Sequence, residues 1–189
     1  MMRKIILDTT KNLKMKSLIK KYGITLRYVE EKDAEFIVGL RTNKSRSIFI
    51  SSTSSDIENQ IKWIKEYKER ESNQEEFYFI AYDHEGEPYA TYRLYNRTKD
   101  SIEIGSYLSK PDYPNPLNSI KLDVLMKEFV FEDLKFDKLV FEVRKKNRSV
   151  VKYHKLYNPL LEKEDEMNYY FTQYKTSFED AKGKIKKLF

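Results

Sequence analysis

The residues with the clearest chemical potential surround a junction between Ser101 and Leu134. The sequence SIEIGSYL, residues 101–108, alternates apolar and polar side chains as a strand does. After the loop KPDYPNPLNS, residues 110–119, apolar residues return at helical spacing. At such a junction the first N–H groups of the helix lack backbone acceptors and can bind an anion such as a phosphate. The sequence therefore predicts an anion site here.

The alternation also assigns the strand's side chains to two faces. We expect one face to carry Ile102, Ile104, Ser106 and Leu108, and the other to carry Glu103, Gly105 and Tyr107. Alternation does not say which face is wet. Glu103 is thus open to three readings: a general base, a solvent-facing residue, or a partner of Arg93.

Two arginines and two histidines complete the chemically interesting set. Arg41 and Arg93 could hold a diphosphate through forked hydrogen bonds, although each taken singly is a typical structural salt-bridge partner. His84 and His154 are too few for a histidine-rich metal site, and the absence of cysteine excludes a thiol nucleophile or a cysteine–zinc site. We expect no metal.

The excess of positive over negative charge lies in the N-terminal segment of the chain. Residues 1–22 carry seven of the 36 Lys and Arg residues and one of the 30 Asp and Glu residues, which leaves 29 of each for the rest. A nucleic-acid-binding body should show a basic face, so we expect no nucleic-acid partner. For the extension we favour a solvated helix over an arm that touches RNA or anionic lipid.

The length of 189 residues fits one domain with a real core. We divide it into a basic N-terminal extension (1–23), a body (24–176) and a basic C-terminal tail (177–189). No apolar run approaches a membrane span, and no secretory signal is visible. We expect a cytoplasmic protein.

Apolar periodicity and turn residues predict the elements in order. Helices are expected at 11–22, 33–41, 57–67, 120–134 and 147–157, with Ser55 and Glu58 as a capping box and Asn147 as a cap, and strands at 24–29, 75–83, 89–96, 101–108, 137–143 and 168–176. Gly23 is expected to end the first helix, and residues 160–166 are expected to be a short charged connection. The strands flanking the helix at 120–134 need a crossover and should be parallel. The fold class is α/β (α+β): a mixed, largely antiparallel twisted sheet of about six to seven strands with helices on both faces.

That order, with its residues, resembles the GNAT superfamily of acyl-CoA-dependent N-acyltransferases. The stretches that carry the resemblance are YGITLRYVEEKDAEFIVGLRTN (22–43), QIKWIKEYKERE (60–71), IGSYLSKP (104–111) and FEVRKKNRSVVKYHKLYN (141–158). Within GNAT the chain is similar to a bacterial group that acylates amino sugars for surface polysaccharides. The resemblance covers residues 24–176.

The resemblance implies a site for acetyl-CoA along the junction. It places the pantetheine near Tyr107 and Leu108, and the pyrophosphate on the start of the following helix. The usual glycine-containing loop is absent, and Pro114 and Pro116 supply no N–H. The donors that remain are Leu117, Asn118, Ser119, Ile120 and Lys121, with the Lys121 side chain as a charge partner.

The resemblance also implies the reacting groups. Asn147 matches a family asparagine, and His154 stands where the family has the tyrosine that protonates the departing thiolate. A histidine can donate a proton too, with an unperturbed pKa of about 6.5; Tyr153 and Tyr157 are the fallback acids. Glu103 is the expected base, with Arg41 and Arg93 on the substrate.

Three functions remain open at this point. The first is N-acetyl transfer from acetyl-CoA to the amine of a nucleotide-linked amino sugar. The second is a protein or peptide N-terminal acetyltransferase, which a groove lined with acids would favour. The third is a non-catalytic GNAT-like binding module. Because the chain is rich in Tyr and Phe, we also consider a homodimer.

Overall fold

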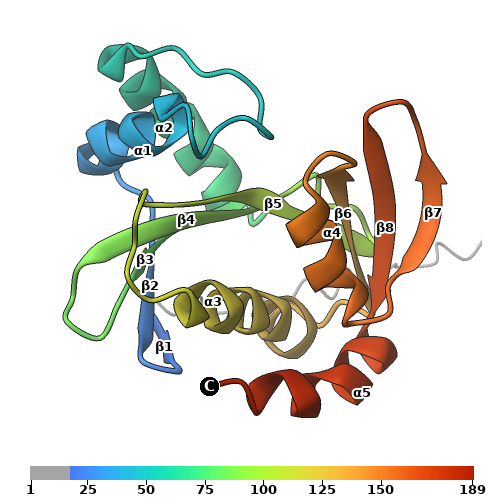
Figure 1. Cartoon of the computed structure of the whole chain (residues 1–189). Coiled ribbons are helices and arrows are strands. Elements are labelled where there is room, and N and C mark those ends of the chain that lie inside the picture. The colour runs from blue at the N-terminus through green and yellow to red at the C-terminus, as the bar shows by residue number, and fades with distance from the viewer. Residues whose placement is uncertain (1–17) are drawn as a thin grey trace, which may run out of the picture.

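The computed structural model describes residues 18–189, which form one eight-stranded sheet with helices on both faces (Figure 1). The strands are β1 (Leu18–Lys21), β2 (Ile24–Tyr28), β3 (Phe77–Tyr82), β4 (Pro88–Tyr95), β5 (Ser101–Ser109), β6 (Lys138–Arg144), β7 (Leu160–Glu164) and β8 (Asn168–Tyr174), in the order β1-β2-β3-β4-β5-β6-β8-β7. Every neighbouring pair is antiparallel except β5 and β6, which are parallel. The predicted fold class is confirmed, with more strands than expected.

The helices divide between the two faces of the sheet. They are α1 (Ala34–Thr42), α2 (Ile57–Ser72), α3 (Leu117–Glu128), α4 (Arg148–Lys155) and α5 (Lys175–Lys186), with a 3-10 turn at Glu31–Asp33 and a π-helical turn at Phe129–Asp133. In Figure 1, α1 and α2 lie above the sheet and α3 and α5 lie below it. The apolar core is accordingly split in two clusters, a small one under α1 and α2 and a large one around α3.

The first strand, β1, corrects the prediction of a helix at 11–22 for the residues that the structure describes; residues 11–17 lie outside them. Leu18–Lys21 pairs with β2 across a two-residue turn at Tyr22 and Gly23. Both turn residues have positive φ, 58° and 74°. A two-residue hairpin turn of type I′ needs this backbone at both positions. Gly23 therefore serves a hairpin and not the end of a helix.

The C-terminal part holds two further corrections. The charged segment at 160–166 contains an edge strand, β7, in which every side chain is exposed. The segment expected as a basic tail is helix α5, whose residues Phe178 and Ile185 are buried against the large cluster.

The start of α2 differs from the expected capping box of Ser55 and Glu58. Asp56 is the N-cap, and its carboxylate accepts hydrogen bonds from the amides of Glu58 (2.9 Å) and Asn59 (3.4 Å). Aspartate is as strong a cap as serine and adds a charge that the helix dipole favours.

A bulge in β5 changes the faces expected for its side chains. Between Gly105 and Leu108 the strand has one residue more than β4 opposite, and Ser106 takes a left-handed backbone with φ of 52°. The extra residue inverts the alternation. Tyr107 therefore packs against the core cluster of Ile102 and Ile104, contrary to the expected pattern.

The bulge lies where β5 and β6 separate. The two strands pair only from Ser101 to Glu103 on β5 and from Lys138 to Val140 on β6. Beyond these residues their facing edges have no strand partner in the described sheet. The separation opens the sheet beside α4.

Glu128, at the end of α3, connects three elements around one buried carboxylate. It is 2% exposed and accepts hydrogen bonds from the hydroxyl of Tyr22 at 2.8 and 2.9 Å. Lys21 (2.6 Å) and Lys186 (3.0 Å) form salt bridges with it. Burial opposes ionisation, but these partners outweigh it and hold the pKa of Glu128 below its usual value. The carboxylate thus joins β1 and α5 to α3.

From residue 18 to residue 189, no helix has the length and apolar character needed to cross a membrane.

Candidate active site

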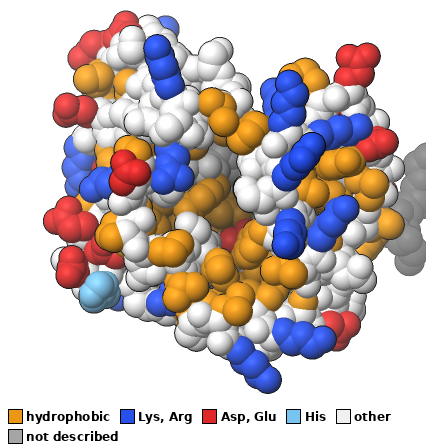
Figure 2. Space-filling view, viewed as in Figure 1, with side chains coloured by type: hydrophobic (Ala, Val, Ile, Leu, Met, Phe, Trp, Pro, Cys, Tyr) orange, Lys and Arg blue, Asp and Glu red, His pale blue; other side chains and the backbone are white. Residues whose placement is uncertain are grey.

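The separation of β5 and β6 opens onto a cavity of about 590 Å³, which we call the large cavity. Figure 2 shows the molecule hollowed between its two halves, with apolar side chains in the hollow and lysines and arginines along its rim. The walls are β5 from Ile104 to Leu108 and β6 from Phe141 to Arg144, together with parts of α3, α4 and residues 46–50. The unpaired strand edges offer backbone donors and acceptors to an extended ligand.

Six of the nine residues predicted for catalysis or cofactor binding line the large cavity: Tyr107, Leu108, Ser119, Ile120, Asn147 and His154. Glu103, Asn118 and Lys121 do not. Asn147 is the N-cap residue of α4, as expected, and its carbonyl accepts a hydrogen bond from the amide of Val151 at 3.0 Å, but its side chain makes no capping hydrogen bond. Its Oδ1 accepts a hydrogen bond from the hydroxyl of Ser149 at 3.3 Å.

The proline-containing loop before α3 is held by aromatic and polar contacts. Tyr113 stacks on Tyr89 at 4.6 Å and donates a hydrogen bond to Asp83 at 2.9 Å. The Asn118 side chain donates to the hydroxyl of Tyr113 at 2.8 Å, which turns it away from the large cavity. Lys121 lies over the ring of Phe189 at 5.7 Å instead.

Two of the expected pyrophosphate donors already have acceptors. The amide of Asn118 donates to the carbonyl of Asn115 at 3.1 Å, and that of Ser119 to the carbonyl of Pro116 at 3.2 Å. Arg46 and Arg144 line the large cavity, and in place of these amides they can form charged hydrogen bonds to phosphates.

A buried polar network between α3 and α4 reaches the wall of the large cavity, which Tyr92, Asp123 and Tyr153 line. The Asp123 carboxylate, 5% exposed, accepts hydrogen bonds from the hydroxyls of Tyr92 (2.9 Å) and Tyr153 (2.7 Å) and pairs with Lys127, which is 0% exposed. Burial opposes its ionisation, but the Lys127 cation and these donors hold the pKa of Asp123 below its usual value. Of the two fallback acids, Tyr153 donates its hydroxyl proton to this carboxylate, and Tyr157 is fully buried and does not line the large cavity.

His154 lies beside this network and also lines the large cavity. Its Nδ1 lies 3.5 Å from Nζ of Lys127, and its ring packs on Phe141 with the centroids 4.5 Å apart. Burial and the neighbouring Lys127 cation lower the pKa of His154 to about 3. The imidazole is therefore neutral at pH 7, and it is a poor source of a proton for a thiolate.

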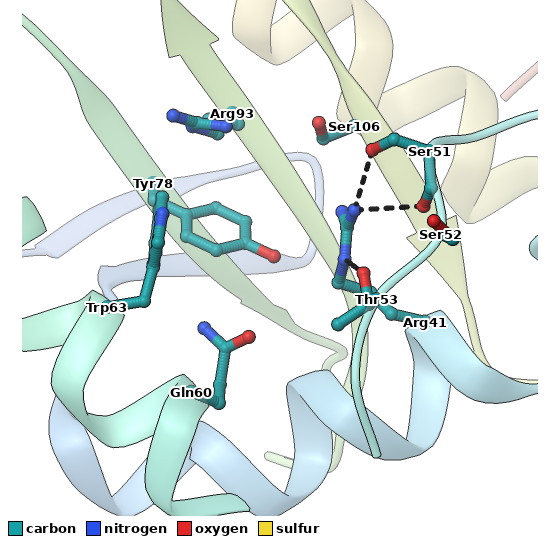
Figure 3. A pocket seen from close by; sticks show the side chains of 9 residues that line it. All are labelled: Arg41, Ser51, Ser52, Thr53, Gln60, Trp63, Tyr78, Arg93 and Ser106. Atoms are coloured by element: carbon teal, nitrogen blue, oxygen red, sulfur yellow. Dashed lines mark hydrogen bonds between the residues drawn. The ribbon is translucent and has the colours of Figure 1, made fainter. Parts of the chain in front are cut away.

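A second cavity of about 300 Å³, the small cavity, lies on the side of α1 and α2 (Figure 3). Ser106, at the bulge, lines both cavities. The remaining lining residues are Arg41, Ser51, Ser52, Thr53, Gln60, Trp63, Tyr78 and Arg93. Two cations and no carboxylate thus line the small cavity within the described part of the chain.

Arg41 and Arg93, the predicted substrate residues, are both fixed in place there. Arg41 donates from Nε to the hydroxyl of Thr53 at 2.5 Å and from Nη2 to the hydroxyl of Ser51 at 3.1 Å. The Arg93 guanidinium lies between the rings of Trp63 (4.9 Å) and Tyr95 (4.8 Å), and its Nε donates to Glu76. In the described residues no hydrogen bond uses its Nη1 or Nη2.

Trp63 is a supporting residue. Tyr67 stacks parallel to its ring at 5.7 Å, and Arg93 lies over the indole. With these neighbours the indole holds Arg93 more readily than it could stack on a ligand.

Glu103 stands apart from both cavities. Its carboxylate accepts hydrogen bonds from the hydroxyl of Tyr95 (3.0 Å) and from Nδ2 of Asn96 (2.8 Å). Tyr95 does not line the small cavity either, but the Arg93 guanidinium, which does, lies over the Tyr95 ring at 4.8 Å.

Comparisons with known proteins agree with this geometry. The family model of the GNAT acetyltransferase domain matches residues 11–155. The solved structure of apo FdhC, described as a nucleotide-linked sugar GNAT, is 34% identical, covers 86% of this chain and 92% of its own, and has a TM-score of 0.77. No curated protein is matched by the chain.

More distant structures share the fold. Spermidine N-acetyltransferase from Vibrio cholerae, solved with CoA and spermine, is 15% identical, with coverages of 84% and 99% and a TM-score of 0.72. Ribosomal-protein-S5-alanine acetyltransferase from Vibrio fischeri is 14% identical, with coverages of 83% and 96% and a TM-score of 0.71.

The chain belongs to the GNAT acetyltransferases. It is an acyl-CoA-dependent N-acyltransferase, and acetyl-CoA is its cosubstrate. The large cavity fits this cosubstrate, because it combines free strand edges for an amide-bearing chain with cations for phosphates.

Several site residues escaped the prediction from sequence. Phe49 and Ile50, which line the large cavity, belong to an irregular segment that no periodicity marks. Asp123 and Lys127 carried a usable signal. They are charged residues four apart on a helix whose last seven positions are all buried.

Proposed function

We propose that this protein transfers the acetyl group of acetyl-CoA to the amine of a nucleotide-linked amino sugar, in the synthesis of a surface polysaccharide or another glycan. The observation that carries the proposal is the small cavity, which Arg41 and Arg93 line and in whose wall the described chain places no carboxylate. An anionic acceptor fits such a wall, because one guanidinium group can donate two parallel hydrogen bonds to two oxygens of a phosphate.

Ser106 lines both cavities, and this supports transfer of the acetyl group from the large cavity to an acceptor in the small cavity. An acceptor in the small cavity and a thioester in the large cavity meet at the β5 bulge. Aligning the two reactants in this way lowers the entropic cost of the reaction. The similarity to FdhC, a nucleotide-linked sugar GNAT, favours the same class of acceptor.

The alternative acceptors fit the small cavity less well. A polyamine is a polycation, and it would meet two guanidinium groups in a wall that holds no carboxylate within the described chain, since Glu76, the ion-pair partner of Arg93, lies outside the lining. An N-terminal acetyltransferase is favoured by a groove lined with acids, and the small cavity has the opposite charge. The homodimer and the cytoplasmic location stay predictions.

The test is the release of CoA thiol with a panel of acceptors. We expect turnover with at least one nucleotide-linked amino sugar, and much slower turnover with spermidine and with a peptide that has a free N-terminus. Turnover with the peptide or spermidine alone would contradict the proposal.

A matched pair of variants locates the acceptor. Arg93 and Arg70 both donate to Glu76 and both lie against Trp63, but only Arg93 lines the small cavity. Arg93→Lys keeps the charge and removes the fork. It should raise KM for the acceptor by about tenfold or more with little change in KM for acetyl-CoA. Arg70→Lys should change neither, and equal effects of the two substitutions would refute the assignment.

A further inference from the structure

The environment of Nζ of Lys127 determines the chemical state of His154. Lys127 is 0% exposed, and three groups surround its nitrogen: the carboxylate of Asp123, Nδ1 of His154 at 3.5 Å, and the face of the Tyr157 ring at 3.9 Å. An ammonium group has three N–H donors and no acceptor. The three neighbours are all acceptors, so each proton of the ammonium has a partner.

This arrangement leaves one tautomer for His154. Since Lys127 can only donate, Nδ1 must be the bare acceptor nitrogen, and the ring proton must sit on Nε2. A second proton on Nδ1 would point at a buried cation. In the described chain, Nε2 has no hydrogen-bond partner, while the ring lines the large cavity.

We propose that Lys127 is a positioning residue that fixes His154 as a neutral imidazole protonated at Nε2, and that this N–H donates a hydrogen bond to the thioester of acetyl-CoA without giving up its proton. The inference rests on the acetyl-CoA site and not on the identity of the acceptor. It replaces the expectation that His154 protonates the thiolate.

The reaction balances without a proton from His154. The amine nitrogen forms a bond to the thioester carbonyl carbon, and the carbon–sulfur bond breaks with its electron pair on sulfur. The amine loses one proton and the CoA thiolate gains one, so the reaction balances whichever base or water carries the proton between them. The Nε2–H stabilises the negative charge that develops on the thioester, as a fixed hydrogen-bond donor does.

The groups around His154 explain why a change of pH should leave it unaffected. Asp123 and Lys127 face it from α3, Tyr153 (5.2 Å between ring centroids) from α4, and Phe141 from β6. Glu142 and Arg144 of β6 line the same cavity. The Asp123 carboxylate favours protonation of His154, but burial of the ring and the Lys127 cation, which lies within hydrogen-bonding distance, outweigh it and keep the pKa of His154 low.

Nuclear magnetic resonance of the free full-length protein tests the tautomer directly. The chain has two histidines, and His84, whose side chain is 73% exposed, is an internal reference. A long-range proton–nitrogen spectrum distinguishes the two tautomers of each neutral ring from the charged ring. His154 should keep the Nε2–H signature from pH 5 to pH 8. Titration of the His154 ring in this range, or the Nδ1–H signature for His154, would overturn the proposal.

Substitutions test the role in transfer. The amide nitrogen of glutamine can replace Nε2–H, so His154→Gln should keep kcat within about tenfold of the natural enzyme. His154→Phe has no donor and should lower kcat by about a hundredfold, with an unchanged KM for acetyl-CoA. Equal losses in the two variants would overturn the hydrogen-bond role.

Lys127→Met tests the positioning role. It should let His154 titrate near neutral pH and add an inflection to the pH profile of kcat. An unchanged profile would show that Lys127 does not set the state of His154. If this variant does not fold, the spectrum of the natural protein still decides the tautomer, and neither measurement depends on which amino sugar is the acceptor.

Discussion

The buried pair of Asp123 and Lys127 allows the sharpest prediction about stability. Asp123→Asn keeps the shape of the side chain and removes its charge. Lys127 would then be a fully buried cation without a counter-ion, and the hydroxyls of Tyr92 and Tyr153 would lose a charged acceptor. Removing one partner of a buried ion pair costs about 3–5 kcal/mol. That is a large part of the 5–15 kcal/mol that typically holds a domain folded.

A double variant separates the charge effect from simple loss of contacts. Lys127→Met alone should also cost about 3–5 kcal/mol, because Asp123 is left buried and unpaired. Asp123→Asn with Lys127→Met removes both charges. The Tyr92 hydroxyl can still donate to the asparagine oxygen, and Tyr153 still has the hydroxyl of Tyr157 at 2.8 Å, so the double variant should cost only about 1–3 kcal/mol.

Urea unfolding of the natural protein and the three variants measures this coupling. The single substitutions should sum to far more than the double one, with a coupling energy of several kcal/mol. A cost below about 1 kcal/mol for Asp123→Asn, or additive effects, would refute the reasoning that Lys127 is a buried cation.

Three further predictions concern other parts of the fold and site. A Cβ on Gly105 would lie 2.7 Å from the hydroxyl of Tyr95, whereas one on Gly39 has nothing within 4 Å. Gly105→Ala should therefore lower the free energy of unfolding by about 1–3 kcal/mol, while Gly39→Ala within α1 should raise it by about 0.5–1 kcal/mol. Similar Tm values for the two variants would contradict this. The pKa of Glu128 is lower in the folded protein than its unfolded value of 4.5. The ionised carboxylate therefore stabilises the fold above pH 4.5, and this stabilisation is lost as the pH falls through the pKa of the folded state. Glu128→Gln should therefore cost about 1–3 kcal/mol at pH 6 and much less at pH 3, and an equal cost at both would exclude the ionised carboxylate as the source. If Glu103 accepts the amine proton through Tyr95, Glu103→Gln and Tyr95→Phe should each lower kcat by about tenfold or more. Unchanged kcat values would show that Glu103 has a structural role only.

Much of the fold could be predicted because its elements carry apolar residues in recognisable patterns. Strand β6 alternates buried and less buried residues, whereas β3 is a nearly continuous buried run and the last seven residues of α3 are all buried. The two extra strands had no such pattern. All five side chains of β7 are exposed, so backbone pairing alone defines that strand. At β1, a glycine that ends a helix and a glycine in a type I′ turn look the same in sequence.

The site could be predicted only in part, since much of it depends on contacts between distant segments. The residues of β5 and α4 that line the large cavity were found through the motif order. The inversion at Ser106 was invisible, because a bulge is defined by its pairing with β4. The state of His154 depends on Lys127, which is 27 residues away in the chain.

The nature of the acceptor is tested most directly by kcat/KM for one amino sugar presented with and without its nucleoside diphosphate. Because Arg41 and Arg93 line the small cavity, we predict that the nucleotide-linked form is preferred by about tenfold or more. Equal values for the two forms, or a higher value for spermidine or a peptide amine, would contradict a nucleotide-linked amino sugar as the substrate.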